Sequence, residues 1–219
     1  MTGDPPLPAG SFSTWLAGMR RVLGGEGGSA VPCDGCTACC TSSQFIHIGP
    51  DETETRAHIP TELLFPAPRL PRGNVLLGYD ERGHCPMLVD GACSIYEHRP
   101  RTCRTYDCRV FPAAGFDLDG EDKAAIAERA RRWQFDFPAE NDAVEHAAVQ
   151  SAARFVLEHA DLLPEGVAPA TAAQRAVLAV EVHDAFLRID AETNRSVVVP
   201  NPRPEAIRAA LTSAPRSRG

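Results

Sequence analysis

Four cysteines lie within eight positions near the start of the chain, in the stretch CDGCTACC. They are Cys33, Cys36, Cys39 and Cys40. A disulfide needs its two Cα atoms within about 7 Å, so four thiols on one loop cannot each be bridged to a separate distant element. Thiolates are also the usual ligands of zinc and of iron-sulfur clusters. The crowding therefore indicates metal binding or redox-active thiols.

A second group of four cysteines follows, at Cys85, Cys93, Cys103 and Cys108. Between the first two of these, Asp90-Gly91 joins the run PMLV to the run ACSIY. A two-residue Asp-Gly turn between such runs is typical of a β-hairpin, because glycine tolerates the positive φ angle that a type I′ turn requires. The turn therefore predicts a hairpin that brings distant residues together.

A regular ladder around this turn would place Cys93 opposite Leu88, and Cys85 opposite Tyr96. Because side chains alternate along a strand, Cys85 and Cys93 would then point to opposite faces of the hairpin. We expect these two cysteines to serve different metals, unless a β-bulge re-aims one of them.

The segment after the hairpin is expected to support the site. Pro100 suits the first position of a helix, which would place Cys103 near a helix N-terminus, where backbone N–H groups favour a thiolate. Arg99 and Arg104 are expected to steady the ligands without binding metal themselves. Tyr96 is expected to pack beside the site with its hydroxyl tied to a neighbour, and not to be catalytic.

The elements that position these residues divide the chain into three predicted parts. Residues 1–30 form a helix, with apolar residues at helical spacing over 11–23, followed by a glycine-rich linker. Residues 31–115 form the cysteine domain, which is rich in turn-forming residues, and residues 116–219 contain no cysteine and show helical patterns. The predicted fold is α+β: a small metal-binding domain with a hairpin and short helices, followed by a helical C-terminal region.

Within the C-terminal region, Ile126, Ala130 and Trp133 predict one helical stripe. Thr171 and Gln174 fit a capping box at the start of a later helix. An apolar face is expected to continue along that helix, and it comprises Leu178, Val182, Ala185, Phe186 and Ile189. These stripes predict packed helices and not a cofactor site.

Charge and composition exclude several classes of function. The net charge of -7 disfavours a nucleic-acid or anionic-lipid surface, and no apolar run is long enough to span a membrane. The first residues, MTGDPPLPAG, have neither the basic nor the apolar region of a secretory signal, so we expect a cytoplasmic protein whose thiols stay reduced. No nucleophile-base pair or phosphate-binding loop is evident, so whether the protein is an enzyme stays open, as does any protein partner.

The cysteine pattern resembles a family whose hallmark is C-x2-C-x2-C-C followed by C-x7-C-x2-Y-x2-R-P-x2-C-R, and which is described as zinc- or iron-chelating. The resemblance covers about residues 31–110. The positions that fall on the hallmark are Cys33, Cys36, Cys39, Cys40, Cys85, Cys93, Tyr96, Arg99, Pro100, Cys103 and Arg104. The pattern also resembles the cysteine-bearing part of flagellin lysine N-methylases, which implies an iron-sulfur cluster as the cofactor.

Spacing favours an iron-sulfur cluster over zinc. Zinc sites commonly pair two C-x2-C knuckles, and the downstream cysteines offer no second knuckle. The run Cys33, Cys36, Cys39 matches the C-x2-C-x2-C of bacterial ferredoxins, and Cys85-Pro86 is similar to the C-P that ends that motif. Zinc remains the alternative cofactor. With eight thiols available, His47, His84 and His98 are not expected to bind metal.

Three functions fit this reading. The first is a redox or cluster-dependent role for an iron-sulfur protein. The second is a zinc-stabilised interaction module without catalysis, which needs closed four-coordinate sites and an exposed apolar patch. The third is a thiol-based redox sensor in which Cys39 and Cys40 react with oxidants.

Overall fold

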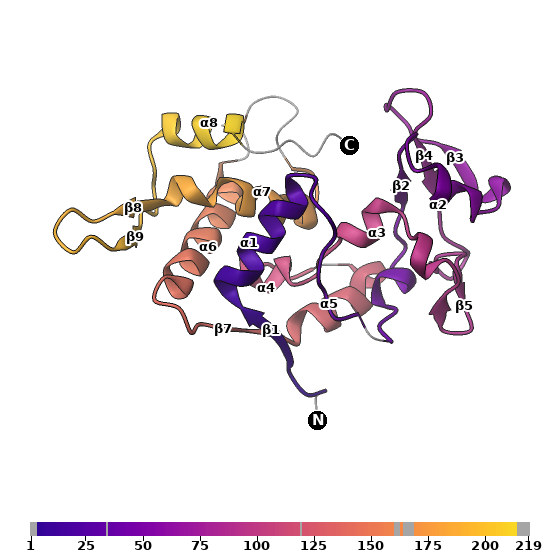
Figure 1. Ribbon diagram of the computed structural model, residues 1–219, viewed down its shortest axis with the longest axis horizontal. Helices are drawn as coiled ribbons and strands as arrows, with labels where there is room; N and C mark the ends of the chain where they lie inside the picture. Colours follow the sequence, from indigo (N-terminus) through magenta and orange to yellow (C-terminus); the bar gives the residue numbers. More distant parts are fainter. Residues whose placement is uncertain (1–3, 34, 119, 160–162, 164–168, 214–219) are drawn as a thin grey trace. The chain divides into compact units, whose positions relative to one another are not determined.

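The computed structural model describes residues 4–33, 35–118, 120–159, 163 and 169–213, and it contains two compact units (Figure 1). The helical unit comprises residues 4–26, 108–118 and 130–213, and the cysteine unit comprises residues 27–107 and 120–129, as far as these are described. Helices and several small sheets are both present, which confirms the predicted α+β class. The units are defined by spatial contacts, so the sequence domains 1–30, 31–115 and 116–219 stay a prediction.

The helical unit is built around two long helices, α6 (Asp142–Glu158) and α7 (Ala172–Val182), which pack against each other. Their facing surfaces carry small residues, including Ala148, Ala152 and Ala176, all completely buried. Small side chains allow two packed helices to approach each other closely. Around this pair lie α4 (Val110–Ala114) and α8 (Pro204–Ser213). None of the described helices has the length and apolar character needed to cross a membrane.

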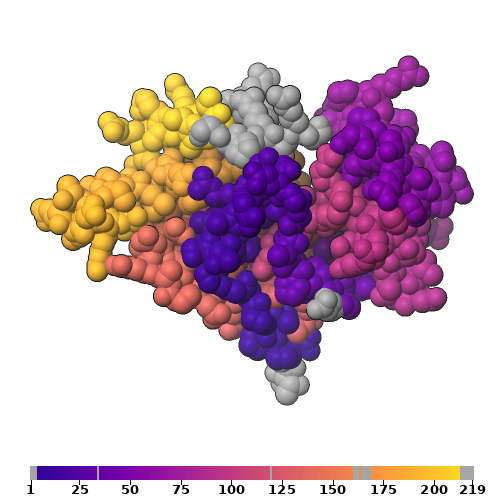
Figure 2. Space-filling view, in the orientation of Figure 1, coloured from indigo at the N-terminus to yellow at the C-terminus, as the bar shows by residue number. Residues whose placement is uncertain are grey.

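Helix α1 (Phe12–Leu23) covers α6 and α7 with its apolar face, and in the space-filling view it lies beside α6 on the surface of this unit (Figure 2). Two side chains, those of Ser11 and Asp142, hold its first turn by hydrogen bonds. The Ser11 side chain accepts a hydrogen bond from the Thr14 amide, as an N-cap should. The buried carboxylate of Asp142 accepts from the amides of Ser13 at 2.8 Å and Ala139 at 2.7 Å. The helix predicted over residues 11–23 is therefore confirmed.

The start of α7 agrees with the sequence and its end does not. Thr171 and Gln174 form the predicted capping box. The helix stops at Val182, however, and the chain continues as the 3-10 turn η6 (His183–Phe186) into strand β8 (Leu187–Ile189). The predicted helical face is therefore wrong beyond Val182, because Ala185 and Phe186 lie in η6 and Ile189 lies in β8. Strand β8 pairs with β9 (Ser196–Val198), and this pairing competes with the helix.

Strand β1 (Leu7–Ser11) pairs in parallel with β7 (Trp133–Asp136), far away in the sequence. Helix α5 (Ala124–Arg131) leads into β7 and passes from the cysteine unit into the helical unit. The predicted helical stripe is confirmed at Ile126 and Ala130, both buried, whereas Trp133 already belongs to the strand.

The cysteine unit has short elements around a small core. Strands β2 (Ile46–Ile48), β4 (Val75–Leu77) and β3 (Leu64–Pro66) form an antiparallel sheet in the order β2-β4-β3. The short helices are α2 (Thr53–Ala57) and α3 (Arg101–Thr105). The 3-10 turns are η1 (Ala38–Thr41), η2 (Thr61–Leu63), η3 (Tyr96–His98) and η4 (Glu121–Lys123). Such short pieces bury little apolar area each, so further interactions must hold them together.

The predicted hairpin is present but short. Strands β5 (Leu88–Val89) and β6 (Ala92–Cys93) pair in the predicted register, and Asp90 and Gly91 both have positive φ angles, 49° and 77°. The ladder ends after two residues on each side. The predicted pairing of Cys85 with Tyr96 is therefore wrong, because Tyr96 has already turned into η3.

A buried carboxyl group in the helical unit makes its stability depend on pH. Burial raises the pKa of Glu181, on α7, to about 7. The unfolded chain ionises this group at ordinary acidic pH, whereas the folded chain keeps it protonated up to about pH 7. Its contribution to stability is therefore fully present below about pH 4, declines as the pH rises, and is lost above pH 7.

We expect Glu181→Gln to raise the melting temperature at pH 8 by a few degrees and to change it little at pH 4. After allowance for solvent screening, the effect corresponds to about 1 kcal/mol. Thermal unfolding followed by circular dichroism at both pH values measures it, with Glu158→Gln, an exposed carboxyl on α6, as control. Equal shifts at the two pH values would contradict the expectation.

Candidate metal centre

All eight cysteines are free thiols, and they do not all lie in the same unit. Seven belong to the cysteine unit, where each is half-buried. Cys108 belongs to the helical unit and is buried. The two groups therefore have different surroundings.

The first cysteine segment is a pair of tight turns. The Cys36 amide donates to the Cys33 carbonyl at 2.8 Å, with Gly35 between them at a φ of 65°. Turn η1 follows and carries Cys39 and Cys40. The Ser42 hydroxyl donates to the Ala38 carbonyl at 2.6 Å and closes this turn. Glycine suits the left-handed backbone position, so the C-x2-C segment can reverse its direction here.

The two halves of the cysteine motif meet through the backbone. The Cys85 amide donates a hydrogen bond to the Cys40 carbonyl at 2.7 Å. Cys85 in turn accepts from the Leu88 amide at 2.9 Å, which starts the hairpin that carries Cys93. Residues 45 positions apart in the sequence are thereby neighbours, and the hairpin is anchored to the first loop.

Three cysteines of the second group share one apolar support. Cys85, Cys93 and Cys103 pack against a single hydrophobic cluster. Its buried members are Ile46, Ile48, Ile59, Leu77, Met87 and Ile95. Cys85 and Cys93 were expected to diverge onto opposite faces of a regular ladder. They contact the same cluster instead, since the ladder does not extend to Cys85.

The thiols influence one another electrostatically. Burial, reinforced by Cys85 and Cys93, raises the pKa of Cys40 to about 11. Burial, reinforced by Cys85, Cys40 and Cys93, raises the pKa of Cys103 to about 12. Burial also raises the pKa of Cys85, with Cys93 contributing. The four thiols of Cys40, Cys85, Cys93 and Cys103 are therefore near neighbours. The raised pKa values mean that Cys40, Cys85 and Cys103 stay protonated at neutral pH when no metal is bound.

The first turn forms a second pair. Burial and the neighbouring Cys36 thiol raise the pKa of Cys33, whereas the positive charge of Arg129 opposes the shift. Cys36 also contributes to the raised pKa of Cys40, after burial and the closer thiols. The Cys33–Cys36 turn therefore adjoins the four-thiol group.

As the side chains stand, no group of three or more His, Cys, Asp or Glu residues in the described part of the chain could hold a single metal ion. Two of the nearby imidazoles have other partners: His47 bonds to Asn74 at 2.8 Å and His98 pairs with Glu54 at 3.1 Å.

Of the predicted supporting residues, Arg99 lies close enough to act on the thiols electrostatically. The Arg99 Nε donates to the Tyr96 carbonyl at 2.8 Å, and its guanidinium lies 3.6 Å from the centroid of the Tyr96 ring. Its positive charge opposes the effect of burial, so the pKa of Cys40 and that of Cys103 rise less than they would without it. Arg104 approaches the Glu52 carboxylate at 3.9 Å. The roles predicted for Tyr96, Arg99 and Arg104 stay predictions.

Cys108 has structural partners. The Trp133 indole N–H donates to the Cys108 sulfur at 3.1 Å, and only 7% of Cys108 is exposed. Arg109, beside it, donates to the Ala9 carbonyl at 3.2 Å. These contacts join the start of α4 to β1 and β7, and they give Cys108 a place in the core of the helical unit.

Sequence reasoning missed two groups near the site. Lys123, in η4, donates to the carbonyls of Ser42 at 2.7 Å and Ser43 at 3.2 Å, which ties residues 120–129 to the first cysteine loop. Glu52 is a buried carboxylate beside α3. Its only signal in the sequence was the turn GPDE before α2, which predicts a turn and gives no partner.

Residues 32–130 match the family model CxxCxxCC, described as "Putative zinc- or iron-chelating domain". These residues, a little under half of the chain, therefore match a CxxCxxCC domain. The match extends past the last cysteine to residue 130, and the structure agrees with this boundary, because residues 120–129 belong to the cysteine unit. The resemblance inferred from the cysteine spacing is thus confirmed. The family description also supports the prediction of a metal-binding cysteine cluster. No curated protein and no solved structure matches the chain.

The surroundings of Cys108 give a prediction that separates it from the other cysteines. We expect Cys108→Ala to lower the free energy of unfolding by about 1–2 kcal/mol, because the buried indole N–H loses an acceptor and the core loses a sulfur atom. The metal content per chain should stay the same. Denaturant unfolding and elemental analysis measure the two quantities, with Cys93→Ala as the comparison that should lose metal. Loss of metal from Cys108→Ala would make Cys108 a ligand.

Proposed function

We propose that the CxxCxxCC domain binds one metal centre through Cys40, Cys85, Cys93 and Cys103. The observation that carries this proposal is the hydrogen bond between Cys85 and Cys40, which joins the two halves of the motif. The packing of Cys85, Cys93 and Cys103 on one hydrophobic cluster supports it further. Cys33, Cys36 and Cys39 then line the centre or hold a second metal. Cys108, a ligand candidate from the sequence, is left out because of its contact with Trp133.

An iron-sulfur cluster is the occupant that we propose. The C-x2-C-x2-C spacing of Cys33, Cys36 and Cys39, which bacterial ferredoxins share, supports this choice. When bound, such a cluster would supply one-electron chemistry. The chain itself contributes four sulfur ligands, the apolar cluster beneath them and the positive charge of Arg99.

A zinc-stabilised interaction module is the second candidate, and an exposed aromatic cluster favours it. Phe45, Phe65 and Tyr79 expose 56%, 39% and 41% of their surfaces. The Phe45 ring lies 6.0 Å from Phe65 and 4.9 Å from Tyr79, centroid to centroid. Exposed apolar patches are typical of interaction sites. A thiol-based redox sensor is less well supported, because the raised pKa of Cys40 leaves little reactive thiolate at neutral pH.

The identity of the metal separates these functions. We expect the full chain, purified without oxygen, to be brown and to contain iron and acid-labile sulfide. Its broad visible absorption should bleach when a strong reductant is added. A colourless protein with one equivalent of zinc would exclude the cluster and support the interaction module. Protein that contains neither metal, even after reconstitution, would overturn the metal-binding proposal altogether.

The assignment of ligands gives a separate prediction. Cys40→Ser and Cys103→Ser lie in opposite halves of the motif, and each should lower the metal content of the purified protein by more than half, because both belong to one centre. Elemental analysis per folded chain measures this. Cys108→Ser is the matched control and should keep its metal. Full occupancy in either of the first two variants rules out that cysteine as an essential ligand.

A further inference from the structure

Glu52 is a buried acid beside the proposed centre. It follows the turn after β2 and precedes α2, and only 8% of the residue is exposed. A buried carboxylate is unfavourable unless hydrogen bonds replace the water that it has lost. The partners of Glu52 therefore indicate what the residue does.

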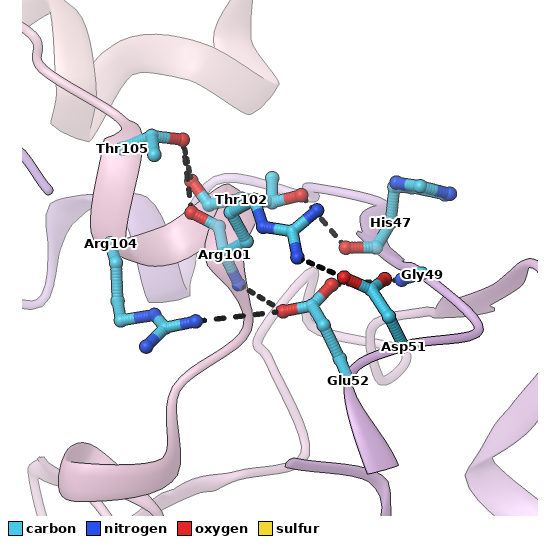
Figure 3. Close-up of polar contacts among 8 residues, drawn as sticks. All are labelled: His47, Gly49, Asp51, Glu52, Arg101, Thr102, Arg104 and Thr105. Carbon is cyan, nitrogen blue, oxygen red and sulfur yellow. Dashed lines mark hydrogen bonds and ion pairs between the residues drawn. The ribbon is translucent and has the colours of Figure 1, made fainter. Parts of the chain in front are cut away.

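Both oxygens of the Glu52 carboxylate accept hydrogen bonds from backbone N–H groups (Figure 3). Oε2 accepts from the amide of Gly49 at 2.8 Å, within its own loop. Oε1 accepts from the amide of Arg101 at 2.5 Å, at the start of α3. The Arg104 guanidinium lies 3.9 Å from the same Oε1. One side chain thus joins the loop after β2 to the helix that carries Cys103.

Two further contacts run between the same two segments. The Thr102 hydroxyl donates to the His47 carbonyl at 2.7 Å, and the Arg101 guanidinium forms an ion pair with Asp51. The residues on both sides of Cys103 are therefore held by residues 47–52. Helix α3 has only five residues, and so short a helix is not stable without external contacts.

The loop that presents Glu52 is itself constrained. A Cβ atom at Gly49 would lie 2.6 Å from the Asp51 Oδ1, so only glycine fits beside the two acids without a shift. The Gly49 amide is also the group that fixes the Glu52 carboxylate. Glycine at position 49 thus leaves room for the Asp51 and Glu52 side chains.

We propose that Glu52 is a positioning residue of the metal centre: its carboxylate fixes the start of α3 and thereby aims the Cys103 thiol at the other cysteines. This inference rests on the proposed metal-binding function. Glu52 binds no metal itself, since its two oxygens already accept backbone N–H groups. Its role is comparable to that of groups around other metal sites that orient a ligand without touching the metal.

The test uses the full chain, reduced and freed of metal, with Zn²⁺ as the probe in competition with a chromophoric chelator. Glu52→Gln keeps the size of the side chain, but its amide has one acceptor oxygen in place of two, and its NH₂ group would face a backbone N–H. We expect Zn²⁺ affinity to fall 10- to 100-fold. Glu62→Gln, an exposed acid in the same unit, is the matched control and should bind as tightly as the unchanged chain.

A double-mutant cycle distinguishes positioning from general loosening of the unit. If Glu52 acts through Cys103, Glu52→Gln should change the affinity less than about 2-fold once Cys103→Ser is present. A merely structural role would give the same fold loss in both backgrounds, which would overturn the proposal. Substitution with Co²⁺ adds a spectroscopic readout, since its thiolate charge-transfer absorption should weaken in Glu52→Gln.

The outcomes separate this inference from the function on which it rests. If the unchanged chain neither binds Zn²⁺ or Co²⁺ through thiolates nor assembles an iron-sulfur cluster on reconstitution, the proposed metal site is wrong. Tight binding by the unchanged chain together with unchanged binding by Glu52→Gln would defeat the positioning role alone. If Glu52→Gln does not fold, Thr102→Val removes the second anchor of α3 at constant size and should lower the affinity in the same cycle. An additive result for that variant would count against the proposal.

Discussion

The cysteine unit depends on the contacts that join its two cysteine segments, among which is the hydrogen bond from the Cys85 amide to the Cys40 carbonyl. Its secondary structure elements are too short to be stable alone, and no disulfide closes the chain. This bond holds the hairpin against the first cysteine loop. Cys85, Cys93 and Cys103 also pack against one hydrophobic cluster, which stabilises the same arrangement. The apolar cluster is small, so a metal that joins the same segments would add a substantial part of the stability of this unit.

Local signals in the sequence were sufficient for several features. The Asp90-Gly91 turn, the Thr171–Gln174 capping box and the first helix each depend on neighbouring residues, and the structure confirms them. The cysteine spacing was distinctive enough to identify the domain. In each case the residues that determine the structure lie within one or two turns of one another, so no knowledge of distant partners was needed.

The features that the sequence did not reveal depend on distant partners. Tyr96 could not be excluded from the hairpin without knowing where the chain turns into η3, and the helical stripe through Ile189 could not anticipate the pairing of β8 with β9. The structural partner of Cys108 is Trp133, 25 positions away. Glu52 illustrates the same limit, because its carboxylate accepts a hydrogen bond from the amide of Arg101, which is 49 positions away in the sequence. The buried state of that acid follows from tertiary contacts alone.

The parallel pairing of β1 with β7 has a consequence for the synthesis of the chain. Leu7 leaves the ribosome long before its partner Trp133, a delay on the order of ten seconds at ordinary elongation rates. During that interval the apolar face of α1, which includes Phe12, Trp15 and Met19, has no α6 to cover it. The whole cysteine unit emerges in the meantime. The nascent chain would thus expose this aromatic face to chaperones while its thiols are already available for metal loading.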